Sequence, residues 1–388
     1  MSNSFWKQAR LELTGRCNLR CSYCYASQKN SSYYIKNELS LEKWFQVIEE
    51  CKGMGIDYFA LIGGEPLLYP NFWDIVKKLE NCFVAVTTNA TLVNEEFIEK
   101  LKLHPQLQEI RISIDGLESN DKVRVGSSYK EILEKISLLN KKTDLKITIQ
   151  TTLNEQNIKE IDRLYSLLKD LNIYKWRINP FQYYLGDNVK NNENEIEFKS
   201  YDSLVQEMKK IVERDLKERP DFDLEIYMFY HSNIAEEGWD ETSLTDHPCE
   251  YRLPMLCIQA NGDIAFCPVL DMVFSNIKDY ESLKEAAETE SRLKWEYFEI
   301  KDTECKNCKY VKICSTGCRE RSLSLLKKIE GPDPVACCII PKIYAEIVPI
   351  LPEEQRKIFL DLVDHNGDEP VTKGNNIEDA IKNYRKKR

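Results

Sequence analysis

A strand-like run followed by an amphipathic helical segment recurs about every thirty residues between residues 8 and 180, the pattern of consecutive β/α units. The expected strands lie at residues 9–13, 57–62, 83–88, 109–114, 146–152 and 174–179. The clearest expected helices lie at residues 40–55, 94–103 and 128–142. Six units are fewer than the eight of a closed barrel. We therefore predict the α/β fold class, with a partial TIM-like (β/α)6 barrel.

Short motifs follow four of these strands in order. The spacing CxxxCxxC at 17–24 follows the first strand, GGEP at 63–66 the second, TTN at 87–89 the third and SIDG at 113–116 the fourth. In barrels of this kind the loops at the carboxyl ends of the strands converge on one mouth. We therefore expect a functional site at that mouth.

The chain contains fourteen cysteines and only four histidines. The start MSNSFWKQAR has no apolar signal segment, and no apolar run has membrane-spanning length, so we expect a cytoplasmic protein without membrane contact. Cysteines in a reducing compartment point to metal or redox chemistry, and the scarcity of histidine favours all-thiolate ligation. Cys51 and Cys82 stand alone in apolar surroundings and are predicted to be core residues.

Three cysteines at the start of the chain, Cys17, Cys21 and Cys24, are one ligand short of a closed four-coordinate site. A structural zinc site with a distant fourth ligand is one interpretation. The spacing, with the aromatic Tyr23 before the last cysteine, resembles the radical S-adenosylmethionine (SAM) superfamily. The resemblance implies a [4Fe-4S] cluster whose open iron takes the amino and carboxylate groups of SAM.

The later motifs extend this resemblance over residues 8 to 185. GGEPLL resembles the family's GGE motif, in which the glutamate receives the methionine ammonium group, and the segment around SIDG resembles the family's fourth strand. The cofactor contacts that the resemblance implies are Tyr23, Gly63, Gly64, Glu65, Pro66, Ser113 and Asp115. Asn89 and Thr151 are weaker candidates, for which a turn-forming role fits at least as well.

A second group of cysteines begins with CEYRLPMLCIQANGDIAFC, in which Asn261 and Gly262 predict a hairpin turn. It continues with CxxCxxxxxCxxxC at 305–318 and with a cysteine pair at 337–338. This arrangement resembles the SPASM domain, which implies two auxiliary [4Fe-4S] clusters. The implied ligands are Cys249, Cys267 and Cys318 for the first cluster, and Cys305, Cys308, Cys314 and either Cys337 or Cys338 for the second.

Two details of this second group stay open. The first auxiliary cluster lacks an evident fourth ligand, and Cys257 either supplies it or is an apolar residue of the hairpin. All-thiolate zinc is the alternative metal for the spacing at 305–318. The module is loop-rich and poor in aliphatic residues, so bound metal must contribute to its folding.

We expect four regions: a radical SAM partial barrel at 1–190, a bridging segment at 191–248, an auxiliary-cluster SPASM domain at 249–340 and a C-terminal helical tail at 341–388. Within the bridge we expect a helix at about 200–218 and a strand at 223–230. The end of the tail, after about residue 366, is expected to be loosely held.

The resemblance implies an enzyme that cleaves SAM reductively to a 5′-deoxyadenosyl radical. SPASM-bearing members modify peptides and proteins, so we predict hydrogen abstraction from a ribosomally made peptide, with formation of a thioether or carbon–carbon crosslink. The alternatives are an anaerobic sulfatase-maturating, formylglycine-forming enzyme and, in another class, an iron–sulfur electron-transfer or scaffold protein without SAM turnover. No catalytic acid or base can be chosen from the sequence.

The expected partners follow from this function. They are a peptide or protein substrate and a reductant such as flavodoxin or ferredoxin. Only sixteen residues precede Cys17, so binding of a leader peptide is expected to use a separate leader-peptide-binding protein, the bridging segment or the C-terminal helices. The formal net charge of −10 disfavours nucleic acid as a partner.

Overall fold

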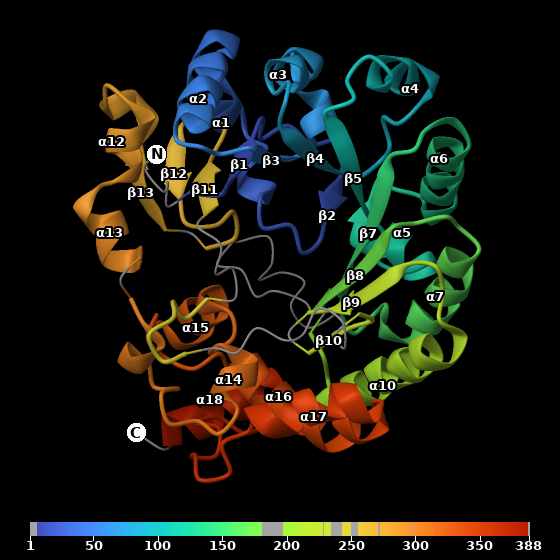
Figure 1. The fold of residues 1–388 in the computed structure, drawn as a ribbon, viewed down its shortest axis with the longest axis vertical. Coiled ribbons are helices and arrows are strands. Elements are labelled where there is room, and N and C mark those ends of the chain that lie inside the picture. The colour runs from blue at the N-terminus through green and yellow to red at the C-terminus, as the bar shows by residue number, and fades with distance from the viewer. Residues whose placement is uncertain are drawn as a thin grey trace. The chain divides into compact units, whose positions relative to one another are not determined.

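The computed structural model describes residues 6–180, 197–227, 229–233, 243–249, 255–270, 272–296 and 298–386 (Figure 1). The chain divides into two compact units. Unit 1 comprises Met1–Gln150, Gly186–Asn188 and Leu253–Glu296, and unit 2 comprises Thr151–Leu185, Val189–Arg252 and Tyr297–Arg388. The boundaries of the four predicted regions stay a prediction.

Unit 1 is built on a parallel sheet in the order β7-β5-β4-β3-β1. Its strands are β1 (Gln8–Glu12), β3 (Tyr58–Ile62), β4 (Phe83–Thr88), β5 (Leu107–Ser113) and β7 (Lys146–Leu153), the last of which runs on into unit 2. Each lies within two residues of its predicted position. The repeated β/α pattern was therefore a sound guide to fold class.

Helices cover the outer face of this sheet (Figure 1). They are α2 (Leu41–Gly53), α3 (Phe72–Lys78), α4 (Glu95–Leu101), α5 (Glu118–Val123) and α6 (Tyr129–Lys142). The predicted N-cap Ser40 accepts a hydrogen bond from the Lys43 N–H, and the apolar stripe of α2 buries Cys51. Cys82 is also buried, so both solitary cysteines are core residues, as predicted.

The expected hairpin forms, and it extends the sheet of unit 1. β11 (Met255–Ile258) and β12 (Asp263–Ala265) are antiparallel, Gly262 at their turn has φ +93°, and β13 (Val273–Asn276) follows. β11 also pairs in parallel with β1. The strands β11 and β1 are more than 240 residues apart in sequence, and no local pattern predicts their pairing. Two short helices complete this part, α12 (Leu283–Ala287) and α13 (Glu290–Glu296).

Unit 2 contains the strands β8 (Lys175–Pro180), β9 (Asp223–Ile226) and β10 (Tyr230–His231). β8 and β9 are parallel, whereas β9 and β10 are antiparallel. The single strand expected at 223–230 is therefore two short strands, because the Phe229 N–H donates back to the Ile226 carbonyl and closes a turn. The amphipathic helix α10 (Tyr201–Glu218), expected at about 200–218, packs against α7 (Ile161–Lys169).

Short helices make up the C-terminal half of unit 2: α14 (Val311–Cys314), α15 (Arg319–Leu326), α16 (Pro334–Glu346), α17 (Glu353–Leu362) and α18 (Ile377–Lys386). The expectation of a loose end was wrong. Ile377, Ala380 and Tyr384 of α18 are buried and the helix packs against α16, since its apolar residues recur on one face. In the described part of the chain, no helix combines the length and apolar character needed to cross a membrane.

Candidate active site

The loop that follows β1 carries three half-buried cysteines: Cys17, Cys21 and Cys24. A short strand, β2 (Arg20–Cys21), pairs antiparallel with β6 (Arg124–Val125) and sets Cys21 opposite Arg124. The Ser22 N–H adds a hydrogen bond of 2.8 Å to the Val123 carbonyl. The loop is thus tied to the segment after β5, at the carboxyl end of β1 where the sequence places the site.

Burial raises the pKa of all three thiols, to about 12 for Cys24. Without metal they are therefore neutral near pH 7, and iron binding has to release their protons. Among the described residues, no three His, Cys, Asp or Glu side chains converge on the position of a single metal ion. A four-iron cluster takes each thiolate on a different iron, so it does not require such convergence. The all-sulfur donor set fits that cluster.

The GGE segment lies against the backbone of the cysteine loop. The Gly64 N–H donates to the Thr14 carbonyl and the Glu65 N–H to the Arg16 carbonyl, both at 2.7 Å. A Cβ on Gly63 would lie 2.6 Å from the Thr14 oxygen, and one on Gly64 would overlap the Arg16 carbonyl. The two glycines therefore allow this close approach of two loops, a role that the motif alone does not reveal.

Glu65 is 1% exposed and its carboxylate is held by three donors. The Thr88 hydroxyl donates at 2.7 Å, the Asn89 N–H at 2.8 Å and the Leu67 N–H at 3.2 Å. Burial nevertheless raises the pKa of Glu65. A carboxylate offers about four acceptor positions, so one is left for an ammonium group, whose charge would favour the ionised form. Pro66 opens the short 3-10 helix Pro66–Leu68 beside it.

Tyr23, Asp115 and Arg124 form a buried polar group, at 9%, 1% and 7% exposure. The Tyr23 hydroxyl donates to Asp115 Oδ2, and Arg124 Nη1 donates to the Tyr23 oxygen at 2.9 Å and to Asp115 Oδ2 at 3.4 Å. Burial raises the pKa of Tyr23 well above its usual range, so its hydroxyl stays a donor. Tyr23 and Asp115 thus orient one another, and contact of either with SAM stays a prediction.

The other predicted contacts lie in different surroundings. Asn89 Oδ1 accepts from the Thr91 N–H at 3.0 Å and from its hydroxyl at 2.6 Å, the turn-forming role considered for it. Ser113 ends β5 and is half-buried opposite Gln150 of β7. Thr151, one residue further along, lies on the other face of β7, is fully buried and accepts from the Trp176 indole at 2.9 Å. This placement favours a structural role for Thr151.

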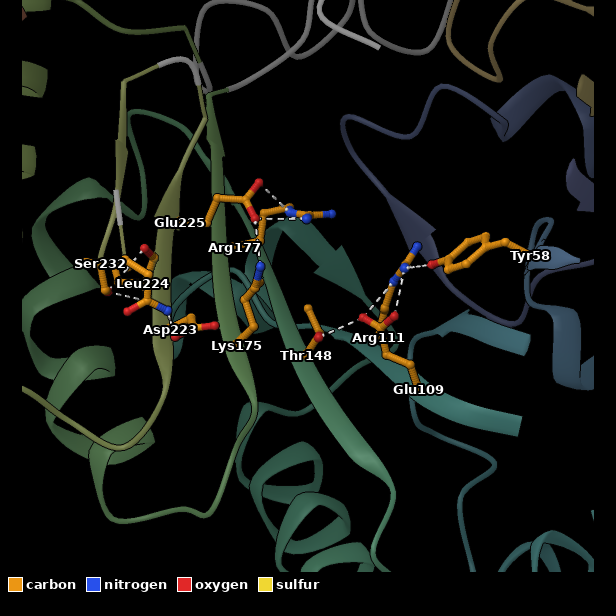
Figure 2. A network of polar contacts seen from close by, with 11 residues as sticks. Tyr58, Glu109, Arg111, Thr148, Lys175, Arg177, Asp223, Leu224, Glu225 and Ser232 are labelled. Carbon is orange, nitrogen blue, oxygen red and sulfur yellow. Dashed lines mark hydrogen bonds and ion pairs between the residues drawn. The ribbon is translucent and has the colours of Figure 1, made fainter. Parts of the chain in front are cut away.

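Polar contacts continue along the face of β5 that carries Ser113 (Figure 2). The Arg111 guanidinium donates to Glu109 at 2.8 and 3.0 Å and to the Tyr58 hydroxyl, and the Thr148 hydroxyl donates to Glu109 at 2.8 Å.

In unit 2, Figure 2 shows Arg177 and Lys175 with Glu225. Burial opposes ionisation of Glu225, but Arg177 and Lys175 outweigh it and lower its pKa.

Sequence reasoning missed several residues of this site. Arg124 lies opposite Cys21, and Glu38 accepts from the Thr14 hydroxyl at 2.6 Å. Glu12 is fully buried and pairs with Lys29 at 2.7 Å, below the cysteine loop. A charged residue within the apolar strand run ARLEL was a usable signal for Glu12. Arg124 had no such signal, because it reaches Cys21 only through the β2–β6 pairing.

In unit 2, Cys305, Cys308, Cys314 and Cys337 are neighbours. Burial raises the pKa of Cys314 well above its usual range, and Cys337, Cys305 and Cys308 raise it further. Burial and then Cys305 raise the pKa of Cys337. Burial also raises the pKa of Cys338, to about 12, but the charged groups that act on it are Asp333, Lys342 and Asp379 rather than other thiols. The structure thus distinguishes two adjacent cysteines that the sequence could not.

The remaining cysteines belong to both units. The Thr316 hydroxyl donates to the Pro248 carbonyl at 3.0 Å, which ties the residue before Cys249 to the loop that leads into Cys318. In unit 1, Cys257 is fully buried on β11, and the Leu270 N–H donates to Cys267 Sγ at 3.1 Å. Burial raises the pKa of Cys257 to about 12. The charges of Glu12 and, to a smaller extent, Cys267 also raise this pKa. Ligation of the first auxiliary cluster by Cys257 stays a prediction.

Comparisons with known proteins agree with this site. The model of the Radical SAM superfamily matches residues 11–168. The chain is 27% identical over 331 residues to an AdoMet-dependent heme synthase of Methanosarcina barkeri, covering 80% of this chain and 90% of that protein. It is 27% identical over 305 residues to the sporulation killing factor maturation protein SkfB of Bacillus subtilis, covering 78% of this chain and 68% of that protein.

A solved structure shares the fold. Streptococcus suis SuiB bound to its precursor peptide SuiA has a TM-score of 0.67 at 19% identity, covering 86% of this chain and 76% of that one. With the cysteine trio, the buried GGE motif and the strand order, the superfamily match identifies residues 11–168 as a radical SAM domain. An enzyme of the radical SAM type, with a [4Fe-4S] cluster and SAM as cofactors, fits these matches, and the SPASM domain stays a prediction.

Proposed function

We propose that this enzyme matures a ribosomally made peptide by hydrogen abstraction, and that the product is a thioether or carbon–carbon crosslink. One observation carries the proposal. The same chain holds an incomplete cysteine trio beside the buried carboxylate of the GGE motif and, separately, a group of four neighbouring thiols. Likeness to a maturation protein, SkfB, supports a peptide substrate.

The residues of unit 1 have distinct roles in this proposal. Cys17, Cys21 and Cys24 hold the cluster, and Glu65 receives the ammonium group of SAM. Bound together, the cluster and SAM supply a radical able to take a hydrogen atom from an unactivated C–H bond. Asp115 and Arg124 hold Tyr23 in place, and the β2–β6 pairing holds the cysteine loop.

We further propose that Cys305, Cys308, Cys314 and Cys337 hold one auxiliary cluster, because these four thiols are neighbours whereas Cys338 is not among them. Cys249 and Cys318, both in unit 2, are proposed ligands of the other auxiliary cluster, and ligation by Cys267 stays a prediction from the sequence. Such clusters can accept the electron that is released when a substrate radical closes a new bond.

The partners in this proposal are the peptide substrate, a reductant such as flavodoxin or ferredoxin, and a separate leader-peptide-binding protein, all in the cytoplasm. Sulfatase maturation is the second candidate, because it uses the same site on a protein substrate. A small-molecule substrate is the third, because the heme synthase relative has a similar extent of sequence similarity.

The test is an anaerobic assay of reconstituted enzyme with SAM and dithionite, followed by chromatography for 5′-deoxyadenosine. We expect turnover in the wild type and only background in a Cys17→Ala, Cys21→Ala, Cys24→Ala variant. Short peptides encoded next to the gene are then added and their masses measured. Loss of two hydrogens supports the crosslink, whereas oxidation of a sulfatase-derived peptide alone would replace the first candidate by the second.

A further inference from the structure

Asp333 of unit 2 contacts both sets of proposed cluster ligands. Its carboxylate Oδ2 accepts from the Cys318 N–H at 2.8 Å, and its backbone carbonyl accepts from the Cys337 N–H at 3.0 Å. Its other carboxylate oxygen caps α16 by accepting from the N–H groups of Val335 and Ala336 at 3.0 and 3.3 Å. One buried residue thus joins the backbones of two cysteines assigned to different clusters.

The loop between Cys314 and Cys318 is shaped to approach Asp333. Ser315, Thr316 and Gly317 all have positive φ, at 48°, 69° and 72°. A Cβ on Gly317 would lie 2.5 Å from Asp333 Oδ2, so the close approach requires glycine there. The two non-glycine residues in left-handed conformation cost free energy, which the surrounding bonds must offset.

Arg321 forms a buried ion pair with Asp333. Its Nε and Nη2 donate to Asp333 Oδ2 at 2.8 and 2.6 Å, and neither side chain is exposed. A buried charge without a partner is strongly unfavourable, and the ion pair supplies that partner. The Asp333 carboxylate is thus bonded to the amide of Cys318, a proposed ligand. The Arg321 guanidinium, one turn along α15, lies beside the same residue.

We propose that Asp333, with Arg321 as its partner, is a positioning residue that holds Cys318 in register with Cys337 and sets the electrostatic environment of the cluster bound by Cys318. The inference rests on the proposed assignment of auxiliary ligands. Loss of the carboxylate would free the Cys318 backbone and remove a negative charge near the cluster. The cluster is then either lost or more easily reduced.

The test compares Asp333→Asn with the wild type in the full, anaerobically reconstituted chain. Asparagine still caps α16 through its single oxygen but cannot also bind the Cys318 amide and Arg321. Iron content, electron paramagnetic resonance and the reduction potential of each cluster are measured. We expect loss of about four iron atoms per chain, or a more positive potential for one auxiliary cluster. The signal that responds to SAM should stay unchanged.

Asn94→Ala is the control, because it removes the N-cap of α4 in unit 1 and reports the effect of a lost helix cap alone. Wild-type iron and potentials in Asp333→Asn would overturn the inference and leave the proposed function intact. A wild-type chain that binds no auxiliary cluster would overturn both. If Asp333→Asn does not fold, Arg321→Lys tests the same point, since it keeps the cap and weakens only the ion pair.

Discussion

The two cysteine-bearing regions differ in what holds their backbones. In unit 1 the trio lies on the loop after β1, and the β2–β6 pairing ties that loop to the segment after α5. In unit 2 the cysteines lie on turns and short helices, and buried side chains make the connecting bonds. Arg319, for example, donates to the carbonyls of Thr316, Ile329 and Gly331. We therefore expect the backbone of the first region to form without iron, and that of the second to depend on a few buried polar groups and on metal.

Removal of iron should separate the two regions most strongly. We expect amides of residues 305–318 and 333–338 to exchange hydrogen faster by about a hundredfold or more, because metal binding supplies folding free energy there. Amides of β3, β4 and β5 should keep their protection, since their bonds are within the sheet. Hydrogen exchange with mass spectrometry on chelated and loaded protein measures this. Equal loss in both regions would contradict the comparison.

Within unit 2, adjacent cysteines should behave differently. Cys337→Ala should lose about four iron atoms per chain, because Cys337 is a neighbour of Cys305 and Cys308. Cys338→Ala is the matched control and should keep its iron, at a cost of about 1 kcal/mol in the free energy of unfolding. Iron analysis and urea unfolding measure the two effects. Loss of iron in Cys338→Ala alone would reverse the ligand assignment.

In unit 1, Arg124→Met should destabilise the fold around the trio. It leaves Asp115 buried at 1% exposure without its cation, for which a loss of about 3–5 kcal/mol is expected. Arg124→Lys keeps the charge and should lose less. The free energy of unfolding from urea titration of the loaded enzyme provides the measurement. A loss equal to that of an exposed arginine would show that the buried group does not anchor the loop.

The smallest expected effect concerns a carboxyl group of unit 2 remote from the cysteines. Burial raises the pKa of Asp215, whose Oδ2 accepts from the Tyr230 and Ser232 hydroxyls at 2.5 and 3.0 Å. As pH rises above the ordinary aspartate pKa of about 3.9, the unfolded chain ionises first and the folded state loses stability. Asp215→Asn should therefore gain stability relative to the wild type as pH rises from about 4 towards 7.

Glu225→Gln is the matched opposite case. Burial opposes ionisation of Glu225, but Arg177 and Lys175 lower its pKa. The stabilisation that the ionised Glu225 contributes is therefore present at neutral pH and is lost as pH falls through the lowered pKa. The variant should be less stable than the wild type at pH 7 and should approach it in acid. Thermal unfolding at a series of pH values measures both slopes. If stability relative to the wild type changed with pH in the same direction for both variants, these assignments would be contradicted.

Much of the site followed from local sequence. The β/α period placed the strands within two residues, and each motif lies at the end of its predicted strand. The partners of those motifs did not follow. The glycines at 63–64 approach the cysteine loop, Asp115 engages Tyr23 and Arg124, and Thr151 faces Trp176. The strand predicted at 223–230 and the loose C-terminal end were wrong, because a turn and a packed helix were decided by long-range contacts.

By itself, the sequence determined the β/α element pattern of this enzyme, since periodicity acts over distances of a few residues, whereas the all-thiolate ligand set stays a prediction. Only the tertiary structure decided that β11 joins β1, that Arg124 faces Cys21 and that Cys337 rather than Cys338 has thiol neighbours. The physical reason is that strand register and the orientation of a helix face are set by packing between distant segments, which no local pattern records.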